Sequence, residues 1–268
     1  MTQCHRIPSS PHSSTRRKKQ QQHHDSSMWQ WFRSFLSSPE SPCGGVGTCF
    51  DDDDGWTVAV EQWLAHKKPT MDSPPTTIPP PFLPQSADWD CGIACLHMIL
   101  AWLEQDSEQL PEWIGTQSVW TIDLVWVLER QGIDYLFVSE TLSVNQHWAE
   151  LSYYRQSFAK DQVRVQERLE ELEFSHWSAL ERSLSLDQVR ELVRNPSVVA
   201  LMLVDNTILR HKEEGSYMGH YILVLDVTAE GWVVHNPAEG PTTVVASELL
   251  ERAWTARGTD RDVVFVCR

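Results

Sequence analysis

Four residues of the chain, Gln85, Cys91, His220 and Asn236, have the side chains that thiol chemistry requires. A cysteine sulfur acts as a nucleophile when its thiolate is stabilised or when a base removes its proton. An imidazole can be that base, and an amide oxygen can fix the tautomer of the imidazole. A second amide can stabilise the oxyanion that forms when the sulfur attacks a carbonyl. These residue types predict hydrolysis or transfer at an amide or peptide bond, with a peptide or protein as the partner substrate.

Cys91 precedes an apolar pattern of helical period. Residues 92–104, GIACLHMILAWLE, predict a helix with Cys91 in its first turn. Unpaired amides and the helix dipole favour a thiolate at that position. Asp90 is predicted to cap the helix. Cys95 lies one turn deeper and is predicted to belong to the core.

His220 begins one predicted strand, and Asn236 ends the next one. A hairpin between these strands brings the amide beside the imidazole, in the role of the orienting residue of a Cys-His-Asn triad. Gln85, shortly before the predicted helix, is the predicted oxyanion donor. Asp226 at the turn and His235 on the face opposite Asn236 are less well placed for these roles.

The order of the remaining elements favours an α+β fold. Helical patterns come first and β-branched runs follow. The predicted helices are 92–104, 121–132, 146–174 and 185–196, and the predicted strands are 198–204, 220–228, 231–236, 242–246 and 262–267. We therefore expect a helical lobe carrying the cysteine helix, packed on an antiparallel sheet that carries His220 and Asn236. The insert 140–195 is expected to border the cleft between them.

The composition divides the chain into three segments. Residues 1–55 are rich in Ser, Pro, Gln and His and are expected to form a disordered, low-complexity tail. Residues 56–81 predict a short helix followed by a proline-rich linker. Residues 82–268 form the predicted folded domain.

The formal net charge of −15 makes nucleic acid a poor partner for the folded part, because an acidic surface repels phosphate. No apolar run is long enough to cross a bilayer, so no membrane span is predicted. The six cysteines lack paired CxxC spacing, and no metal or cofactor is predicted. We expect a cytoplasmic protein, with the nucleus as an alternative because of the basic run STRRKKQQQHH. No oligomeric state follows from the sequence.

Two groups of thiol enzymes share features of this sequence. The order Gln, Cys, His, Asn and its approximate spacing are similar to those of papain-like thiol enzymes. The segment QSADWDCGIACLHMIL resembles the nucleophile motif of the bacteriocin-processing peptidases. In that motif the first cysteine is catalytic, so the resemblance implies that Cys91 is the nucleophile.

A longer resemblance covers most of residues 82–267. The segments QSADWDCGIACLHMIL, SVWTIDLVWVLERQGI, YYRQSFAKDQVRVQERL, GHYILVL, HNPA and ERAWTARGTDRDVVFV resemble the guanylyl cyclase domain-containing protein family, also called plant-type soluble guanylyl cyclases. The family name implies conversion of GTP to cyclic GMP, whereas its motifs look like a papain-like peptidase fold.

Cyclisation of GTP needs a metal held by carboxylates and a surface that binds phosphate. The sequence has no Gly-rich phosphate loop. Asp123 and Asp226 are candidate metal ligands, but we interpret them as a helix N-terminal acid and a turn acid. A thiol hydrolase or transferase is therefore favoured over a guanylyl cyclase, and a non-catalytic interaction protein that retains the fold is the third hypothesis.

Overall fold

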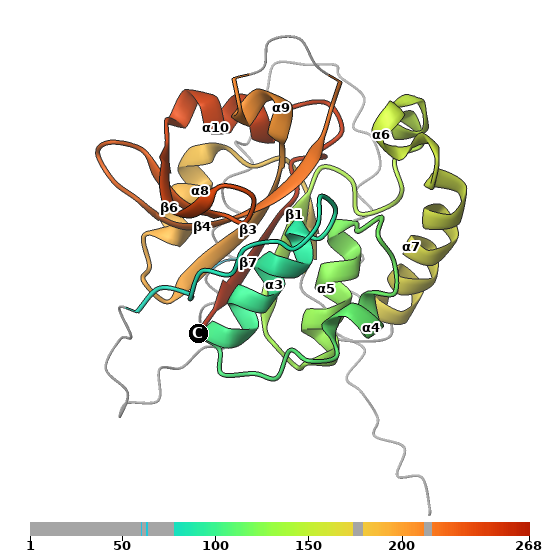
Figure 1. Cartoon of the computed structure of the whole chain (residues 1–268), viewed down its shortest axis with the longest axis horizontal. Helices are drawn as coiled ribbons and strands as arrows, with labels where there is room; N and C mark the ends of the chain where they lie inside the picture. Colours follow the sequence, from blue (N-terminus) through green and yellow to red (C-terminus); the bar gives the residue numbers. More distant parts are fainter. Residues whose placement is uncertain (1–59, 61–62, 64–77, 174–178, 212–215) are drawn as a thin grey trace, which may run out of the picture. The chain divides into compact units, whose positions relative to one another are not determined.

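The computed structural model of the chain describes residues 60, 63, 78–173, 179–211 and 216–268. In this part of the chain, seven strands form one sheet with helices packed on both faces (Figure 1). The predicted α+β class is confirmed, and the cysteine helix packs on the strand that carries His220.

The helical elements, in chain order, are α3 (Cys91–Trp102), α4 (Leu110–Ile114), α5 (Thr121–Arg130), the 3-10 helix η1 (Gln146–Glu150), α6 (Ser152–Arg155), α7 (Phe158–Glu173), α8 (Leu186–Val193), α9 (Asn206–Leu209) and α10 (Ser247–Trp254). The strands are β1 (Tyr135–Ser139), β2 (Ala179–Glu181), β3 (Val198–Asp205), β4 (Gly219–Val227), β5 (Trp232–Asn236), β6 (Gly240–Val245) and β7 (Val263–Cys267).

The strands lie in the order β2-β1-β7-β3-β4-β5-β6. The β1–β2 pair is parallel, and the other neighbouring pairs are antiparallel. The strands β1 and β2 come from the half of the chain that was predicted to be helical, and they add a parallel pair at the edge of the sheet. The predicted antiparallel pairing of the strands that carry His220 and Asn236 is confirmed. The apolar run of β1, YLFVS, is short, and periodicity alone cannot distinguish such a run from a buried piece of helix.

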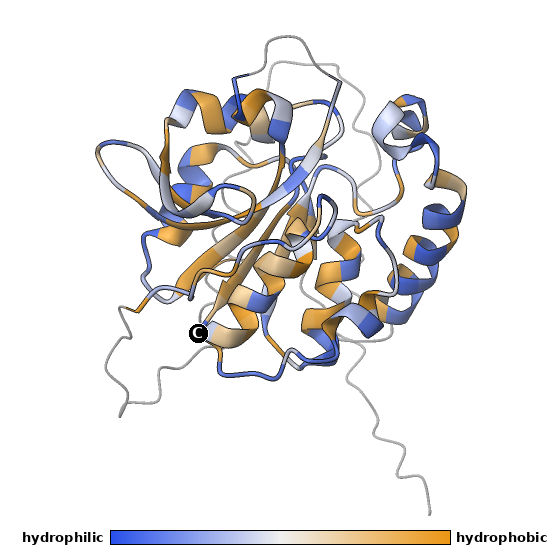
Figure 2. Ribbon diagram, in the orientation of Figure 1, coloured by the Kyte–Doolittle hydropathy of each residue, from blue (hydrophilic) through white to orange (hydrophobic). Residues whose placement is uncertain are grey.

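The sheet separates two apolar cores. One core lies beneath α3, α4, α5 and α7, and the other lies beneath α8 and α10. Alternate residues of β3 and β7 enter opposite cores, so both strands are buried on both faces and read as unbroken apolar runs. Figure 2 shows these hydrophobic strands between helices, with hydrophilic residues along the outer side of α7.

Local signals explain where several elements begin and end. Ser185 caps α8 and forms a capping box with Gln188, as its type predicts. Gly132 follows α5 with a φ of 66°, the left-handed conformation that glycine adopts readily. The helix predicted over 146–174 is interrupted instead and consists of η1, α6 and α7. In α6 the buried Tyr154 donates its hydroxyl to the carbonyl of Gly258 at 3.0 Å.

Residues 60, 63 and 78–81 are described and lie before the folded domain predicted at 82–268. Val60 and Trp63 are helical and pack against the core beneath α8 and α10. The remainder of the tail and most of the linker fall outside the described residues, so the domain boundaries stay a prediction. Within the described ranges, no helix combines the length and hydropathy needed to cross a bilayer.

Candidate active site

Cys91 is the first residue of α3 and lies against β4. Its sulfur accepts a hydrogen bond from the backbone N–H of Tyr221 at 3.5 Å. Gly92 makes this close approach possible, because a Cβ added there would lie 2.9 Å from Cδ2 of Tyr221 and 3.0 Å from Cδ1 of Leu124. The glycine after the cysteine therefore serves the packing of helix on strand.

The surroundings of Cys91 favour a protonated resting thiol. Burial raises the pKa of Cys91, and the Asp90 carboxylate adds to the increase. Hydrogen bonds from the backbone N–H groups of Tyr221 and Gly92 act in the opposite direction and stabilise the thiolate. The balance predicts a neutral thiol at neutral pH, so the sulfur requires a base.

Asp90 does not cap α3 as predicted. Its carboxylate instead turns back and accepts from the backbone N–H groups of Ser86 and Ala87, each at 3.0 Å. The short acidic side chain thereby closes the loop before the helix through bonds to N–H groups three and four residues earlier. The α3 N-terminus keeps its backbone amides directed toward the thiol.

Gln85 is fixed by this loop and by the turn after β5. Its backbone N–H donates to the carbonyl of Pro237 at 3.0 Å, next to Asn236. Its side-chain Nε2 donates to the carbonyl of Ala87 at 2.7 Å, while Oε1 is buried without a hydrogen-bond partner among the described residues. One hydrogen of the side-chain amide is used in this way, and the second is left for another acceptor.

His220 and Asn236 lie on the adjacent antiparallel strands β4 and β5. The ring atom Nε2 of His220 lies 2.8 Å from Oδ1 of Asn236. The backbone N–H of Ala238 donates to that same Oδ1 at 3.0 Å, so the atom facing the ring is an acceptor. His220 must therefore carry its proton on Nε2, which leaves a lone pair on Nδ1.

The state of the His220 ring matches the role of a base. Burial lowers the pKa of His220, and the hydrogen bond to Asn236 opposes the decrease. The Arg210 and Glu239 side chains act on this pKa in opposite directions and pair with each other at 3.0 Å. The resting imidazole is neutral at neutral pH and can accept a proton on Nδ1.

No hydrogen bond joins the Cys91 sulfur to the His220 ring within the described part of the chain. The two residues are connected through Tyr221, which follows His220 along β4 and whose N–H contacts the sulfur. Catalytic hydrogen bonds are often long without substrate and shorten when the substrate binds. Cys91, His220 and Asn236 therefore stay a predicted triad, of which the His220–Asn236 pair is hydrogen-bonded.

His235 holds a structural position on the same hairpin. Its Nδ1 accepts from the N–H of Thr242 at 3.1 Å, so its Nε2 carries the proton and donates to the carbonyl of Pro80 at 3.0 Å. The bond from Nε2 fastens the chain before α3 to the sheet, and the bond to Nδ1 joins β5 to the neighbouring strand β6. This arrangement agrees with leaving His235 out of the predicted site.

The insert between β1 and β2 borders this region. The hydroxyl of Tyr153 in α6 donates to the carbonyl of Gly219 at 3.2 Å, directly before His220. Burial, and then the nearby Cys91, raise the pKa of Tyr153. The residue is 46% exposed to solvent.

The two candidate metal acids have other partners. Asp123 is fully buried and pairs with Nε of Arg164 at 3.1 Å and Nη1 of Arg168 at 2.7 Å. Asp226 is exposed and accepts from the N–H of Val227 at 2.7 Å. Among the described residues, no three His, Cys, Asp or Glu side chains are grouped as metal ligands.

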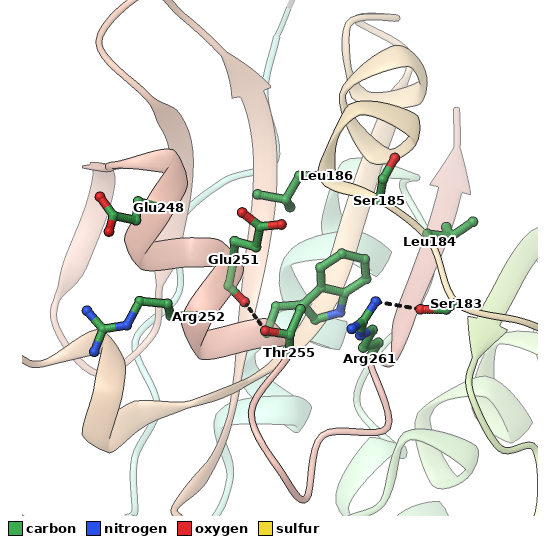
Figure 3. A pocket seen from close by; sticks show the side chains of 10 residues that line it. Ser183, Leu184, Ser185, Leu186, Glu248, Glu251, Arg252, Thr255 and Arg261 are labelled. Carbon is green, nitrogen blue, oxygen red and sulfur yellow. Dashed lines mark hydrogen bonds between the residues drawn. The ribbon is translucent and has the colours of Figure 1, made fainter.

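A cavity of about 540 Å³ lies between the start of α8 and α10, and none of the four predicted site residues lines it (Figure 3). Arg261 crosses one side and donates to the hydroxyl of Ser183 at 2.5 Å. Carboxylates and guanidinium groups both line it, among them Glu248 and Arg252. This mixture of charges specifies no ligand.

Sequence reasoning missed a buried polar group beside the thiol. The Tyr221 hydroxyl lies 3.0 Å from Oγ1 of Thr121. The Thr121 hydroxyl donates to the carboxyl of Asp262. Burial, followed by the neighbouring Asp260, raises the pKa of Asp262 to about 7. The only sequence signal for this buried group is Asp262 itself, an acid directly before the apolar run of β7.

Comparison with known proteins gives the following relatives. The family described as guanylylate cyclase matches residues 81–266. Guanylyl cyclase 1 of Arabidopsis thaliana is 27% identical over 204 residues, which cover 69% of this chain and 74% of that protein.

Two solved peptidase structures are also similar to the chain. The peptidase domain of Streptococcus ComA, a bi-functional ABC transporter involved in a quorum-sensing pathway, has a TM-score of 0.38 and 13% identity, covering 69% of this chain and 97% of that one. A putative C39-like peptidase from Bacillus anthracis has a TM-score of 0.45 and 12% identity, and the match covers 70% of this chain and 94% of that one. The family match extends from the loop before α3 to the last strand of the sheet, and the chain belongs to the guanylylate cyclase family.

Proposed function

We propose that the protein is a thiol hydrolase or transferase that acts on an amide or peptide-type bond of a peptide or protein in the cytoplasm. Cys91 is the nucleophile, His220 the base and acid, Asn236 the orienting residue and Gln85 the oxyanion donor. The observation that carries the proposal is the hydrogen bond from His220 Nε2 to Asn236 Oδ1, which leaves Nδ1 as an acceptor one residue from the strand N–H that contacts the thiol.

The reaction follows from the neutral resting pair. As the Cys91 sulfur attacks the carbonyl carbon, its proton passes to Nδ1 of His220, and the second amide hydrogen of Gln85 stabilises the oxyanion. The oxyanion collapses, the C–N bond breaks, and Nδ1 returns the proton to the leaving amine. Nδ1 then takes a proton from a water molecule as the water oxygen attacks the thioester carbon. The C–S bond breaks, the acid leaves, and the Cys91 sulfur regains its proton from Nδ1.

An activated acyl ester tests this proposal without a known substrate. With p-nitrophenyl acetate, the full chain should form an acetyl thioester on Cys91, located by peptide mass spectrometry, and should then hydrolyse it. His220→Gln should slow both steps by about 10²-fold or more, the lower range for loss of a general base. Cys267→Ser is the control, because this buried thiol lies on β7, which β3 separates from β4 and both separate from β5, and its loss should leave the kinetics unchanged. Acetylation of Cys91 at the rate seen in His220→Gln would contradict the proposal.

A guanylyl cyclase is the second candidate, and family membership favours it. We expect purified protein with GTP and Mg²⁺ or Mn²⁺ to form no more cyclic GMP than the Cys91→Ser variant. Cyclic GMP formation that is lost on changing one acidic residue and kept in Cys91→Ser would favour the cyclase. Absence of both activities would favour an interaction protein that retains the fold.

A further inference from the structure

We propose that Tyr221 is the positioning residue of the thiol, and that Thr121 and Asp262 hold it in place. This inference depends on the proposed function only in assigning Cys91 as the nucleophile. Tyr221 of β4 contacts the Cys91 sulfur through its backbone N–H and not through its ring. Thr121 and Asp262 come from other parts of the fold.

The backbone of Tyr221 forms hydrogen bonds with two residues on consecutive turns of the cysteine helix, α3. Its N–H donates to the Cys91 sulfur at 3.5 Å, and its carbonyl accepts from the thiol of Cys95 at 3.6 Å. The ring lies against Gly92, where no side chain fits. The backbone of Tyr221 therefore sets how close the nucleophile comes to the strand that carries His220.

The hydroxyl of Tyr221 ties this contact to two more elements. It bonds to Thr121, the first residue of α5, and Thr121 donates to Asp262 between α10 and β7. The carbonyl of Asp262 accepts from Nε1 of Trp254 and from the N–H of Leu203, each at 3.2 Å. The acid is thus held rigidly, and it fixes the far end of the Tyr221 ring.

The protonation of Asp262 decides which way these hydrogen bonds run. An ionised carboxylate only accepts, so Thr121 donates to it and Tyr221 donates to Thr121. A protonated carboxyl can donate to Thr121, which then donates to the Tyr221 oxygen. The titratable groups that face Asp262 are Asp260 on the same turn, Tyr154 of α6 and Tyr221 itself, and no ion pair of the described residues includes Asp262.

This geometry predicts that two substitutions away from the thiol change its reactivity. Tyr221→Phe keeps the ring against Gly92 and removes only the hydroxyl. Without the hydrogen bond to Thr121 the ring is held less firmly, so the hydrogen bond from the Tyr221 N–H to the Cys91 sulfur weakens and the thiolate is less stabilised. Alkylation of Cys91 at pH 7 should slow by about fivefold, the equivalent of one ordinary hydrogen bond. Asp262→Asn should remove an inflection near pH 7 from the pH profile of the same rate, because an amide does not titrate.

The experiment measures iodoacetamide labelling of Cys91 in the full chain between pH 5.5 and 9, by peptide mass spectrometry. Tyr135→Phe is the matched control, because it removes another buried hydroxyl that donates to Glu129 at 3.1 Å. Slower labelling in Tyr221→Phe, with an unchanged rate in Tyr135→Phe and with no inflection near pH 7 in Asp262→Asn, supports the proposal. Equal rates in Tyr221→Phe and Tyr135→Phe, or an inflection that persists in Asp262→Asn, would overturn it.

A His220→Gln variant in the same series separates this inference from the proposed function. If His220→Gln labels like the native chain while Tyr221→Phe is slow, the catalytic assignment fails and the positioning role stands. If Cys91 is labelled slowly in His220→Gln but at the native rate in Tyr221→Phe, the positioning role of Tyr221 fails and the catalytic assignment stands. Thr121→Ser keeps the linking hydroxyl, so it should restore the native rate that Thr121→Val loses, which a general loss of packing would not produce.

Discussion

His220 and His235 lie on neighbouring strands of one hairpin and use their ring nitrogens differently. His235 uses both, one as acceptor from Thr242 and one as donor to Pro80, whereas His220 uses only Nε2 within the described residues. Both rings are buried, so burial does not distinguish them. The free acceptor on Nδ1 of His220 is the reason that we propose this residue, and not His235, as the base.

Replacing Asn236 by Asp tests the orienting role. The carboxylate can accept from both His220 and the Ala238 N–H, and its charge stabilises the imidazolium. The pKa of His220 should therefore rise by about one unit or more, as for an opposite charge within hydrogen-bond distance. NMR titration of the ring C–H signals measures the change, with His235 as the internal reference. An unchanged His220 titration would show that the pair is not formed in solution.

Gly92→Ala tests the contact between α3 and β4. The added methyl would lie within about 3 Å of the Tyr221 ring and Leu124, both in the core. Overpacking of this kind costs about 1–3 kcal/mol of unfolding free energy, which urea denaturation measures. Ala101→Ser, on the exposed side of the same helix, is the control and should stay within about 0.5 kcal/mol of the native chain. A Gly92→Ala variant as stable as the native chain would contradict this packing.

The pH dependence of the free energy of unfolding should reveal the titration of Asp262. Burial raises its pKa from 3.8 to about 7, so between these values the folded chain holds a proton that the unfolded chain has lost. Its contribution to stability is therefore present at low pH and declines as the pH rises toward 7. Asp262→Asn cannot titrate, so its melting temperature relative to the native chain should increase between pH 5 and pH 8. A constant difference across that range would mean that Asp262 is ionised throughout.

Asp123→Asn tests whether this acid is structural. The change removes the charge that faces Arg164 and Arg168, and breaking a buried ion pair typically costs about 3–5 kcal/mol. Because Arg164 retains partial exposure, whereas Arg168 is buried, we expect a value near the lower end. Chemical denaturation measures the loss, and Asp226→Asn is the exposed control, expected to be nearly neutral. Loss of Mg²⁺ or Mn²⁺ binding without loss of stability would make Asp123 a metal ligand instead.

The sequence was sufficient to predict those parts of the fold that depend on local patterns. The cysteine helix, the hairpin that joins His220 to Asn236 and the cap at Ser185 each depend on residues close together in the chain. The parallel pairing of β1 with β2 depends on a contact between distant segments, and neither short strand has a diagnostic period.

The same distinction applies to the site. The residue types of the triad were readable, but the partners of individual atoms were not. Asp90 binds the preceding loop in place of the helix, and the group formed by Tyr221, Thr121 and Asp262 joins three elements far apart in sequence. A sequence pattern cannot specify such contacts, because each depends on how the helices pack on the sheet.

The central claim is that His220 activates Cys91, and iodoacetamide labelling at neutral pH tests it most directly. In the native chain, Cys91 should be labelled well before Cys95 and Cys267, and His220→Gln should slow that labelling by at least about tenfold, since the base that takes the thiol proton is lost. His235→Gln is the matched control and should stay within about twofold, because glutamine can donate and accept in its place. Labelling of Cys91 at the same rate in the native chain and in both variants would contradict the account.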